Sequence, residues 1–199
     1  MARTLVLAAL AACALAALPA EAATKALPCS ANGDTVTKND SLRVYELSDS
    51  EGNHEYKACR LRTRERVTIY SYFSCECSTG DEPDLDRVVL AGHFVAVVVP
   101  PNYGPPGNTS PSEMLSSTIR VFDAAKRERV RTVSATPDDL VLRRQGSIAY
   151  RAGAELHVVP RTGTDTLVDA GPVQAGSLRL DGKRLSWISA GTPRSGTLD

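Results

Sequence analysis

The sequence is poor in aromatic residues and has no excess charge of either sign. Aromatic side chains make up 5% of the 199 residues, and 23 lysines and arginines balance 23 aspartates and glutamates. Proteins that bind nucleic acid over a broad surface need clustered excess cation, so this class of partner is not expected. Apolar residues reach 42%, which argues against a disordered chain and predicts one domain of ordinary size.

The common catalytic motifs are also missing. The sequence has no G-x-S-x-G, S-x-x-K or H-E-x-x-H pattern, and residues 176–183 have the wrong spacing for a phosphate-binding loop. The three histidines, His54, His93 and His157, are dispersed and lack the spacing of metal ligands. We therefore predict neither a cofactor nor a metal site, and we favour a non-enzymatic protein. A catalytic triad assembled from distant residues stays open.

Apolar runs of more than strand length are absent after the N-terminus. Residues 1–22 have a cationic start, an apolar stretch and an Ala20-Glu21-Ala22 cleavage site, which is the pattern of a signal peptide. The mature chain, 23–199, is then expected to be secreted or extracytoplasmic, with no transmembrane anchor. Two alternatives stay open. The segment can remain uncleaved as an anchor, or Cys13, which ends a lipobox-like Leu10-Ala11-Ala12-Cys13, can be lipidated.

Cysteine is scarce in the mature chain, and its count is even. Removal of residues 1–22 leaves Cys29, Cys59, Cys75 and Cys77, and an even number in an exported chain predicts disulfides. A bridge between Cys75 and Cys77 would close a strained ring. We therefore expect Cys29 to pair with one of these two and Cys59 with the other. The alternative is a redox-active pair in Cys75-Glu76-Cys77, although such pairs normally have two intervening residues.

The mature chain carries a repeated hairpin pattern with the period of short strands. Each copy has an apolar-x-apolar strand, a turn glycine and a second strand of apolar and small residues. The copies are residues 88–97, 140–150 and 178–187, with turns at Gly92, Gly146 and Gly182. Gly146 and Gly182 are 36 residues apart, close to the length of a four-stranded repeat. A second strand type, with a cationic residue before valine, recurs at 42–45, 119–122 and 156–159.

The last copy also suggests a family. Its segment Leu180-Asp181-Gly182-Lys183-Arg184-Leu185-Ser186-Trp187-Ile188-Ser189 resembles the blade motif of TolB-type, WD40-like β-propeller repeats. The two earlier copies lack the aspartate before the turn glycine. Over residues 40–199 the chain is similar to small exported bacterial proteins of unknown function built from such repeats. This resemblance implies a propeller-like architecture and says nothing about activity.

We therefore predict an all-β fold of repeated four-stranded antiparallel units, arranged as a partial or small propeller-like array. The expected units are a two-stranded half-unit at 41–69 that holds the disulfides, and further units at 88–133, 138–169 and 176–199. These contain thirteen strands, barely three blades, so a β-sandwich is the alternative. The last strand, 192–197, carries a proline and an arginine, which is typical of a protected sheet edge.

Three surface segments are candidate binding sites. The arginines Arg60, Arg62, Arg64 and Arg66 alternate, so on a single strand they would share one face and could bind an anionic polymer. The alternative is a solvated face balanced by neighbouring acids. The Pro- and Gly-rich segment 100–108 predicts a recognition loop with Asn102 and Tyr103 as contact residues, or a plain surface loop. Residues 80–86 hold four carboxylates but lack a complete calcium-loop pattern.

The sequence thus favours an exported, non-enzymatic β-repeat protein that binds an unknown protein or envelope component. The alternatives are a thiol-dependent redox protein using Cys75 and Cys77, and a hydrolase with a dispersed site. The oligomeric state is left open. The function itself rests on analogy between folds, because propellers and their relatives commonly act as binding modules.

Overall fold

The structure is a computed structural model that describes residues 29, 33–72, 85–101 and 116–199. These residues form fifteen strands, arranged as three four-stranded sheets and one three-stranded sheet. Every strand pair is antiparallel, so the predicted all-β class with repeated antiparallel units is confirmed. Within the described ranges, no helix is long and apolar enough to cross a membrane.

Strands that are consecutive in the chain are neighbours in their sheet. Sheet 1 contains β1 (Asp34–Lys38), β2 (Leu42–Ser48), β3 (His54–Arg60) and β4 (Arg66–Tyr72). Sheet 2 contains β5 (Arg87–Ala91), β6 (Phe94–Val99), β7 (Thr118–Asp123) and β8 (Glu128–Ser134). Sheet 3 contains β9 (Asp139–Leu142), β10 (Ile148–Ala152), β11 (Glu155–Val159) and β12 (Thr166–Asp169). Sheet 4 contains β13 (Arg179–Asp181), β14 (Arg184–Ser189) and β15 (Thr192–Thr197).

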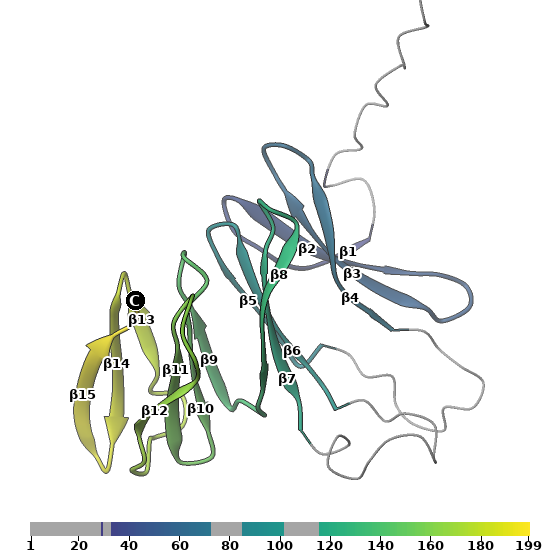
Figure 1. Cartoon of the computed structure of the whole chain (residues 1–199). Coiled ribbons are helices and arrows are strands. Elements are labelled where there is room, and N and C mark those ends of the chain that lie inside the picture. The colour runs from purple at the N-terminus through teal and green to yellow at the C-terminus, as the bar shows by residue number, and fades with distance from the viewer. Residues whose placement is uncertain (1–28, 30–32, 73–84, 102–115) are drawn as a thin grey trace, which may run out of the picture.

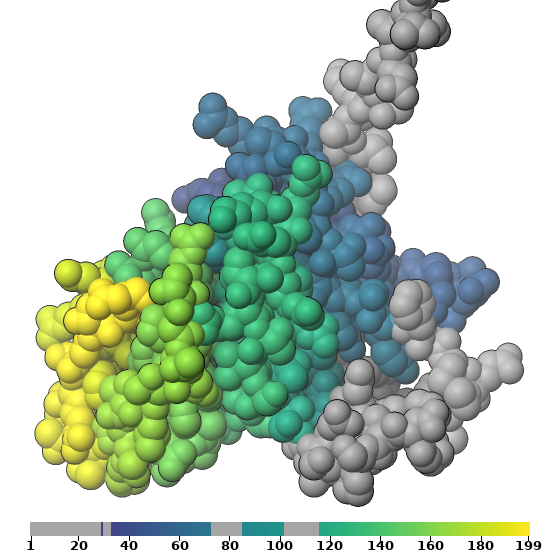
Figure 2. Space-filling view, in the orientation of Figure 1, coloured from purple at the N-terminus to yellow at the C-terminus, as the bar shows by residue number. Residues whose placement is uncertain are grey.

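The four sheets stand face to face in chain order, from the blue of sheet 1 to the yellow of sheet 4 (Figure 1). Their first strands are neighbours, since β1 contacts β5, β5 contacts β9, and β9 contacts β13. The space-filling view shows the successive sheets packed side by side (Figure 2). Stacking of four meanders around their first strands is a propeller-like arrangement. It differs from a β-sandwich, in which two sheets enclose one core.

Three apolar layers fill the spaces between successive sheets, and β6 shows how one strand serves two of them. All six residues of β6 are buried. Alternate side chains of a strand point to opposite faces, so one set packs on sheet 1 and the other on sheet 3. The set toward sheet 1 is Val95, Val97 and Val99, and the set toward sheet 3 is Phe94, Ala96 and Val98. The third layer joins sheets 3 and 4 through Leu156, Leu185, Trp187 and Leu198.

The three predicted hairpins are confirmed. They are the pairs β5–β6, β9–β10 and β13–β14, and the turn glycines Gly92, Gly146 and Gly182 all have positive φ. Gly146 has the strictest requirement, with φ of +91° and no room for a side chain. A Cβ there would lie 2.8 Å from Cε1 of Phe94. The turn of sheet 3 therefore packs directly on the first residue of β6.

Sheet 1 is larger than the half-unit predicted at 41–69. Residues 34–72 form four strands in place of the expected two, which raises the total from thirteen to fifteen. The sequence pattern also grouped 42–45 with 119–122 and 156–159 as copies of one strand type. The last two segments lie in the third strands of their sheets. In the structure 42–45 lies in β2, a second strand. β1 escaped detection because its DTVTK sequence is polar and largely exposed, so it lacks the apolar alternation of a half-buried strand.

The predicted disulfide pairing is wrong for the described cysteines, because Cys29 is bonded to Cys59. Both are buried beside Tyr45 on the face of sheet 1 that points away from sheet 2. Arg43 stacks 5.1 Å above the Tyr45 ring and donates hydrogen bonds to the carbonyls of Cys29 and Gly33. Cys29 thus lies against this face of sheet 1, and spacing alone could not show that it meets β3 there. Cys75 and Cys77 lie outside the described residues.

The last strand, β15, is the edge of sheet 4 and pairs with β14 alone in that sheet. Ala190 and Gly191 both have positive φ, which forms a two-residue hairpin turn that hydrogen-bonds Ser189 to Thr192. Hydrogen-bonded and non-hydrogen-bonded pairs alternate along an antiparallel ladder. The Pro193 nitrogen, opposite Ile188, therefore faces the free side of the sheet. A proline there costs no ladder bond and matches the predicted protected edge.

Candidate binding pocket

The first hairpin turns of all four sheets meet around one open pocket of about 500 Å³. Sheet 1 contributes residues 39–41, sheet 2 contributes 90–92, sheet 3 contributes 142–145, and sheet 4 contributes Leu180, Gly182 and Lys183. The pocket thus lies where the repeated turns converge at one end of the neighbouring first strands. Its volume is within the usual range for small-molecule sites.

The charged lining of this pocket is mostly cationic. Arg143, Arg144 and Lys183 face one acid, Asp40. Among the described residues, none of the three cations forms an ion pair or donates a side-chain hydrogen bond. Arg143 is half-buried, whereas the other three groups are exposed. We call this cavity the turn pocket; it is lined by residues 39–41, 90–92, 142–145, 180 and 182–183.

The backbone of the turn pocket is held by hydrogen bonds that its charged side chains do not share. The Asn39 side-chain carbonyl accepts from the N–H groups of Ser41 and Leu42, both at 2.8 Å. Its amide donates to the Gly92 carbonyl at 3.2 Å and joins the turns of sheets 1 and 2. In sheet 3, Arg143 and Gly146 close their turn through backbone bonds at 2.9 Å. The scaffold is therefore ordered without using the cations.

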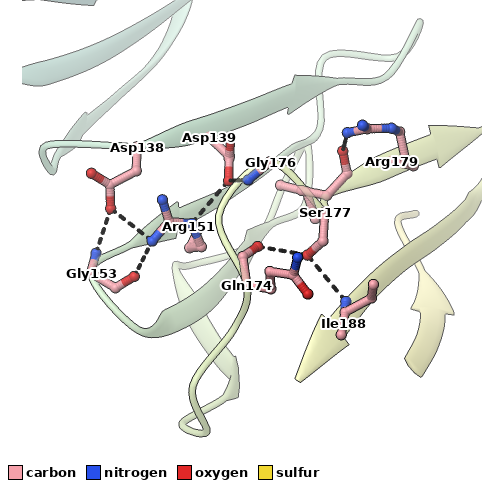
Figure 3. Close-up of polar contacts among 10 residues, drawn as sticks. Asp138, Asp139, Arg151, Gly153, Gln174, Gly176, Ser177, Arg179 and Ile188 are labelled. Atoms are coloured by element: carbon pink, nitrogen blue, oxygen red, sulfur yellow. Dashed lines mark hydrogen bonds and ion pairs between the residues drawn. The ribbon is translucent and has the colours of Figure 1, made fainter. Parts of the chain in front are cut away.

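At the other end of β9 the polar side chains pair with one another (Figure 3). Arg151 donates from Nε to Asp139 at 2.9 Å and contacts Asp138 at 3.1 Å. The N–H of Gly176, in the segment before β13, also donates to Asp139 at 2.8 Å. Burial alone would raise the pKa of Asp139, but the bonds from Arg151 and Gly176 outweigh it and lower that pKa. This Asp–Arg network ties sheet 3 to the start of sheet 4.

A second carboxylate at the same junction is Asp169, whose exposed fraction is 5%. It accepts hydrogen bonds from Trp187 Nε1 at 2.7 Å, Gly171 N at 2.9 Å and Ser189 Oγ at 3.3 Å. The bond from Trp187 is the main cause that lowers the pKa of Asp169. Because its oxygens are occupied by groups of the fold, Asp169 is a structural acid that connects the last strand of sheet 3 to β14.

Each histidine contacts a carboxylate. His54 pairs with Glu46, His93 lies 3.5 Å from Asp123, and His157 lies 3.2 Å from Asp165. The His157 ring stacks on Tyr150 with centroids 4.9 Å apart, and the Tyr150 hydroxyl donates to Asp165. Burial raises the pKa of Tyr150, and the bond to Asp165 raises it further, so the hydroxyl stays protonated and acts as a donor.

The predicted arginine face is not formed. Arg60 ends β3 and Arg66 begins β4, while Arg62 and Arg64 lie in the turn between them. Arg60 also pairs with Glu65 at 2.6 Å. This agrees with the alternative that neighbouring acids balance these arginines. The four residues therefore do not alternate along one strand, because the chain reverses within the run. Anion binding by these residues stays a prediction.

Several other predicted sites lie outside the described residues, namely Cys13, Cys75, Cys77, Asn102 and Tyr103. The acidic segment 80–86 is described only at its last two residues. Within the described ranges, no three His, Cys, Asp or Glu side chains are grouped as metal ligands. Binding of a partner by the loop at 100–108 is thus still a prediction.

The turn pocket was missed by sequence analysis, although its signal was present. The pattern search identified the turn glycines Gly92, Gly146 and Gly182, and the pocket residues lie beside them. Stacked repeats bring equivalent turns together at one end of the array. Comparison of the polar residues beside each turn glycine, such as Arg144 and Lys183, would therefore have indicated a shared cationic site.

No protein-family model and no curated protein matches the sequence. Among solved structures, the chain is similar to an acylaminoacyl peptidase of Pyrococcus horikoshii, with 10% identity and a TM-score of 0.47 over 74% of this chain and 26% of that chain. It is also similar to the β-propeller domain of the trilobed protease from Pyrococcus furiosus, which has an open velcro topology. That match has 10% identity and a TM-score of 0.43, over 75% of this chain and 45% of that chain. The chain spans less than half the length of either matched chain.

Proposed function

We propose that the protein is an exported, non-enzymatic β-repeat module that binds its ligand in the turn pocket. One observation carries this proposal. Four separate sheets each contribute the turn after their first strand to a single cavity. A binding site built from several elements of a rigid scaffold is the arrangement by which loops usually carry recognition.

The scaffold supports this function because its turns are fixed before any ligand arrives. Asn39 links two of the turns, and Gly146 packs on Phe94 with no space for a side chain. A preorganised site loses little conformational entropy on binding, which favours affinity. The charged groups at the junctions between sheets are already paired with each other, whereas Arg143, Arg144 and Lys183 of the turn pocket have no described partner.

The proposed compartment is extracytoplasmic, with residues 1–22 removed as a signal peptide. The Cys29–Cys59 disulfide supports this, because such bonds persist mainly in oxidising compartments. The intact mass of the natively exported protein tests it. A chain that begins at Ala23 supports secretion, and a diacylglycerol-modified Cys13 assigns the protein to the membrane surface. A chain that retains Met1 contradicts both.

The binding role is tested by filling the turn pocket without changing its charge. Gln145 and Ser41 are exposed lining residues on the turns of sheets 3 and 1, so Gln145→Trp and Ser41→Trp introduce bulk into the cavity. Photo-crosslinking of the oxidised protein to envelope extracts compares these variants with a control, Thr132→Trp, on the exposed part of β8. We expect the pocket variants to lose adducts that the control keeps.

Equal adducts in all variants, with unchanged thermal unfolding, would remove the turn pocket as the binding site. A thiol-dependent role would then deserve the next test. With Cys29 and Cys59 bonded, that role depends on Cys75 and Cys77 alone. Alkylation of the exported protein without prior reduction would report whether these two thiols are free.

A further inference from the structure

We infer that the turn pocket binds a small oligoanion that presents two or more carboxylate or phosphate groups. This inference rests on the proposed binding function and adds the chemical class of the ligand. It comes from three cationic side chains, Arg143, Arg144 and Lys183, that line one cavity from two different sheets.

The first argument is that these three cations are grouped around one pocket and have no described partner there. Arg151 pairs with two aspartates, and Arg43 donates to two backbone carbonyls. In the described part of the chain, Arg143, Arg144 and Lys183 have no ion pair and no side-chain hydrogen bond. Grouped cations repel each other, so a cluster without a structural task is favourable only with an anion between its members.

The second argument concerns geometry and donors. Two adjacent guanidinium groups stand on one turn, and the Lys183 ammonium stands on the turn of the next sheet. Guanidinium forks bind carboxylate and phosphate oxygens in pairs, and an ammonium adds a compact point charge. The Asn39 carbonyl oxygen is occupied by two backbone N–H groups and so does not face the ligand as a free acceptor. The lining is therefore rich in donors.

The third argument concerns Asp40, the one acid in the lining. It leaves the pocket with a net charge of about +2, so a ligand with one negative charge gains little over water. A ligand with two or three negative charges is attracted by all three cations, and this attraction exceeds its repulsion by the single carboxylate of Asp40. Because the whole protein is formally neutral, this attraction is local to the pocket and is not a general affinity for anions.

The test uses the oxidised mature protein and four probes: pyrophosphate, citrate, acetate and a pentaglutamate peptide. Calorimetry at low ionic strength measures the dissociation constant of each. We expect pyrophosphate or citrate to bind with a dissociation constant below about 1 mM, and acetate to bind at least about tenfold more weakly. Binding by pentaglutamate that is tighter than by citrate identifies an acidic polypeptide as the source of the anionic groups.

Charge variants make the test specific to the turn pocket. The variant Arg143→Gln/Arg144→Gln/Lys183→Gln should weaken the binding of the best probe at least about tenfold. Arg129→Gln/Arg131→Gln/Lys126→Gln removes the same charge around β8 and should leave binding within about twofold. Asp40→Asn should tighten binding about two- to threefold, because it removes the repulsion.

Two outcomes overturn the inference. One is that no oligoanion binds below about 10 mM, and the other is that both triple variants lose affinity equally. If the tryptophan variants abolish adducts while the charge variants change nothing, the pocket is a binding site for another kind of ligand. If neither set of variants has an effect, the proposed function fails as well.

Discussion

The junctions between the sheets and the turn pocket use the same kinds of charged residue in opposite ways. At the junction of sheets 3 and 4, Arg151 and Asp139 are bonded to each other and to the backbone. Arg143 and Arg144 lie at the other end of the same first hairpin. Within the described residues, their side chains form no ion pair and no hydrogen bond. The difference separates charge that maintains the fold from charge that remains available to a ligand. Substitutions at the junctions should therefore change stability, and substitutions in the pocket should change binding.

The largest effect is expected from the disulfide that joins Cys29 to Cys59 of β3. Cys29→Ser/Cys59→Ser removes a bridge with a sequence separation of 30 residues. The freed chain gains conformational entropy when unfolded, so the free energy of unfolding should fall by about 3–4 kcal/mol. Urea unfolding of the variant and of the wild type measures this loss. A loss below about 1 kcal/mol would show that the bond does not stabilise sheet 1.

The next effect is expected at the turn between β9 and β10. Gly146→Ala forces a side chain into a positive-φ position, 2.8 Å from the Phe94 ring, and should cost about 3 kcal/mol. Gly153→Ala is the matched control, because Gly153 also has positive φ but nothing lies within 4 Å of its Cβ position. The control should cost about 1 kcal/mol. Thermal unfolding measures both, and equal losses would remove the role of the Phe94 contact.

The next largest loss of stability is expected from substitution of Asp169. Asp169→Ala leaves the indole N–H of Trp187 and the hydroxyl of Ser189 buried without their acceptor. Unsatisfied buried donors are costly, so unfolding should require about 2–3 kcal/mol less. Asp181→Ala, on the exposed part of β13, is the control and should change stability by less than about 0.5 kcal/mol. Trp187 fluorescence during urea unfolding reports both. Similar values for the two variants would contradict a structural role for Asp169.

The Asp139–Arg151 network should appear in the pH dependence of stability. The pKa of Asp139 is lower in the folded protein than its ordinary value of 3.8. The folded state therefore favours the ionised acid, and this stabilisation is present above about pH 4 and disappears as the pH falls through the folded pKa. Asp139→Asn should lose about 1 kcal/mol at pH 7 and less at pH 2. Urea unfolding at both pH values checks this, and an equal loss at both would exclude the ionic contribution.

The smallest effect on stability is expected in the turn pocket. Arg143→Gln/Arg144→Gln/Lys183→Gln removes no described ion pair or side-chain hydrogen bond. The free energy of unfolding should change by no more than about 0.5 kcal/mol, while oligoanion binding weakens. If the free energy of unfolding fell by more than about 1 kcal/mol, these cations would stabilise the fold as the charges at the junctions do.

The sequence was sufficient to predict the repeats that have a strong local signal. Hairpins around Gly92, Gly146 and Gly182 combine alternating apolar residues with a glycine at the turn, and the structure contains all three. β1 and β3 carry weaker signals, because β1 is polar and the apolar Tyr56 of β3 lies between Glu55 and Lys57. Their strand pairing depends on partners elsewhere in the sheet.

The turn pocket and the disulfide could not be predicted because both depend on how the sheets and segments are placed in space. Asp40 and Lys183 are far apart in the sequence and meet only when four turns converge. Likewise, Cys29 meets Cys59 on the face of sheet 1 that points away from sheet 2, although the two cysteines are 30 residues apart in the sequence. The strain of a Cys75–Cys77 ring excludes one pairing but carries no information about where Cys29 lies in space.

The proline in β15 has a consequence for how copies of the protein meet at high concentration. An open array exposes an edge strand, and an exposed edge is a template on which a second chain can grow a continuous sheet. On β15 the Pro193 nitrogen faces outward and has no hydrogen to donate, so an incoming strand finds an incomplete ladder. This edge therefore resists growth into fibres, and molecules at high concentration are less prone to pair through it.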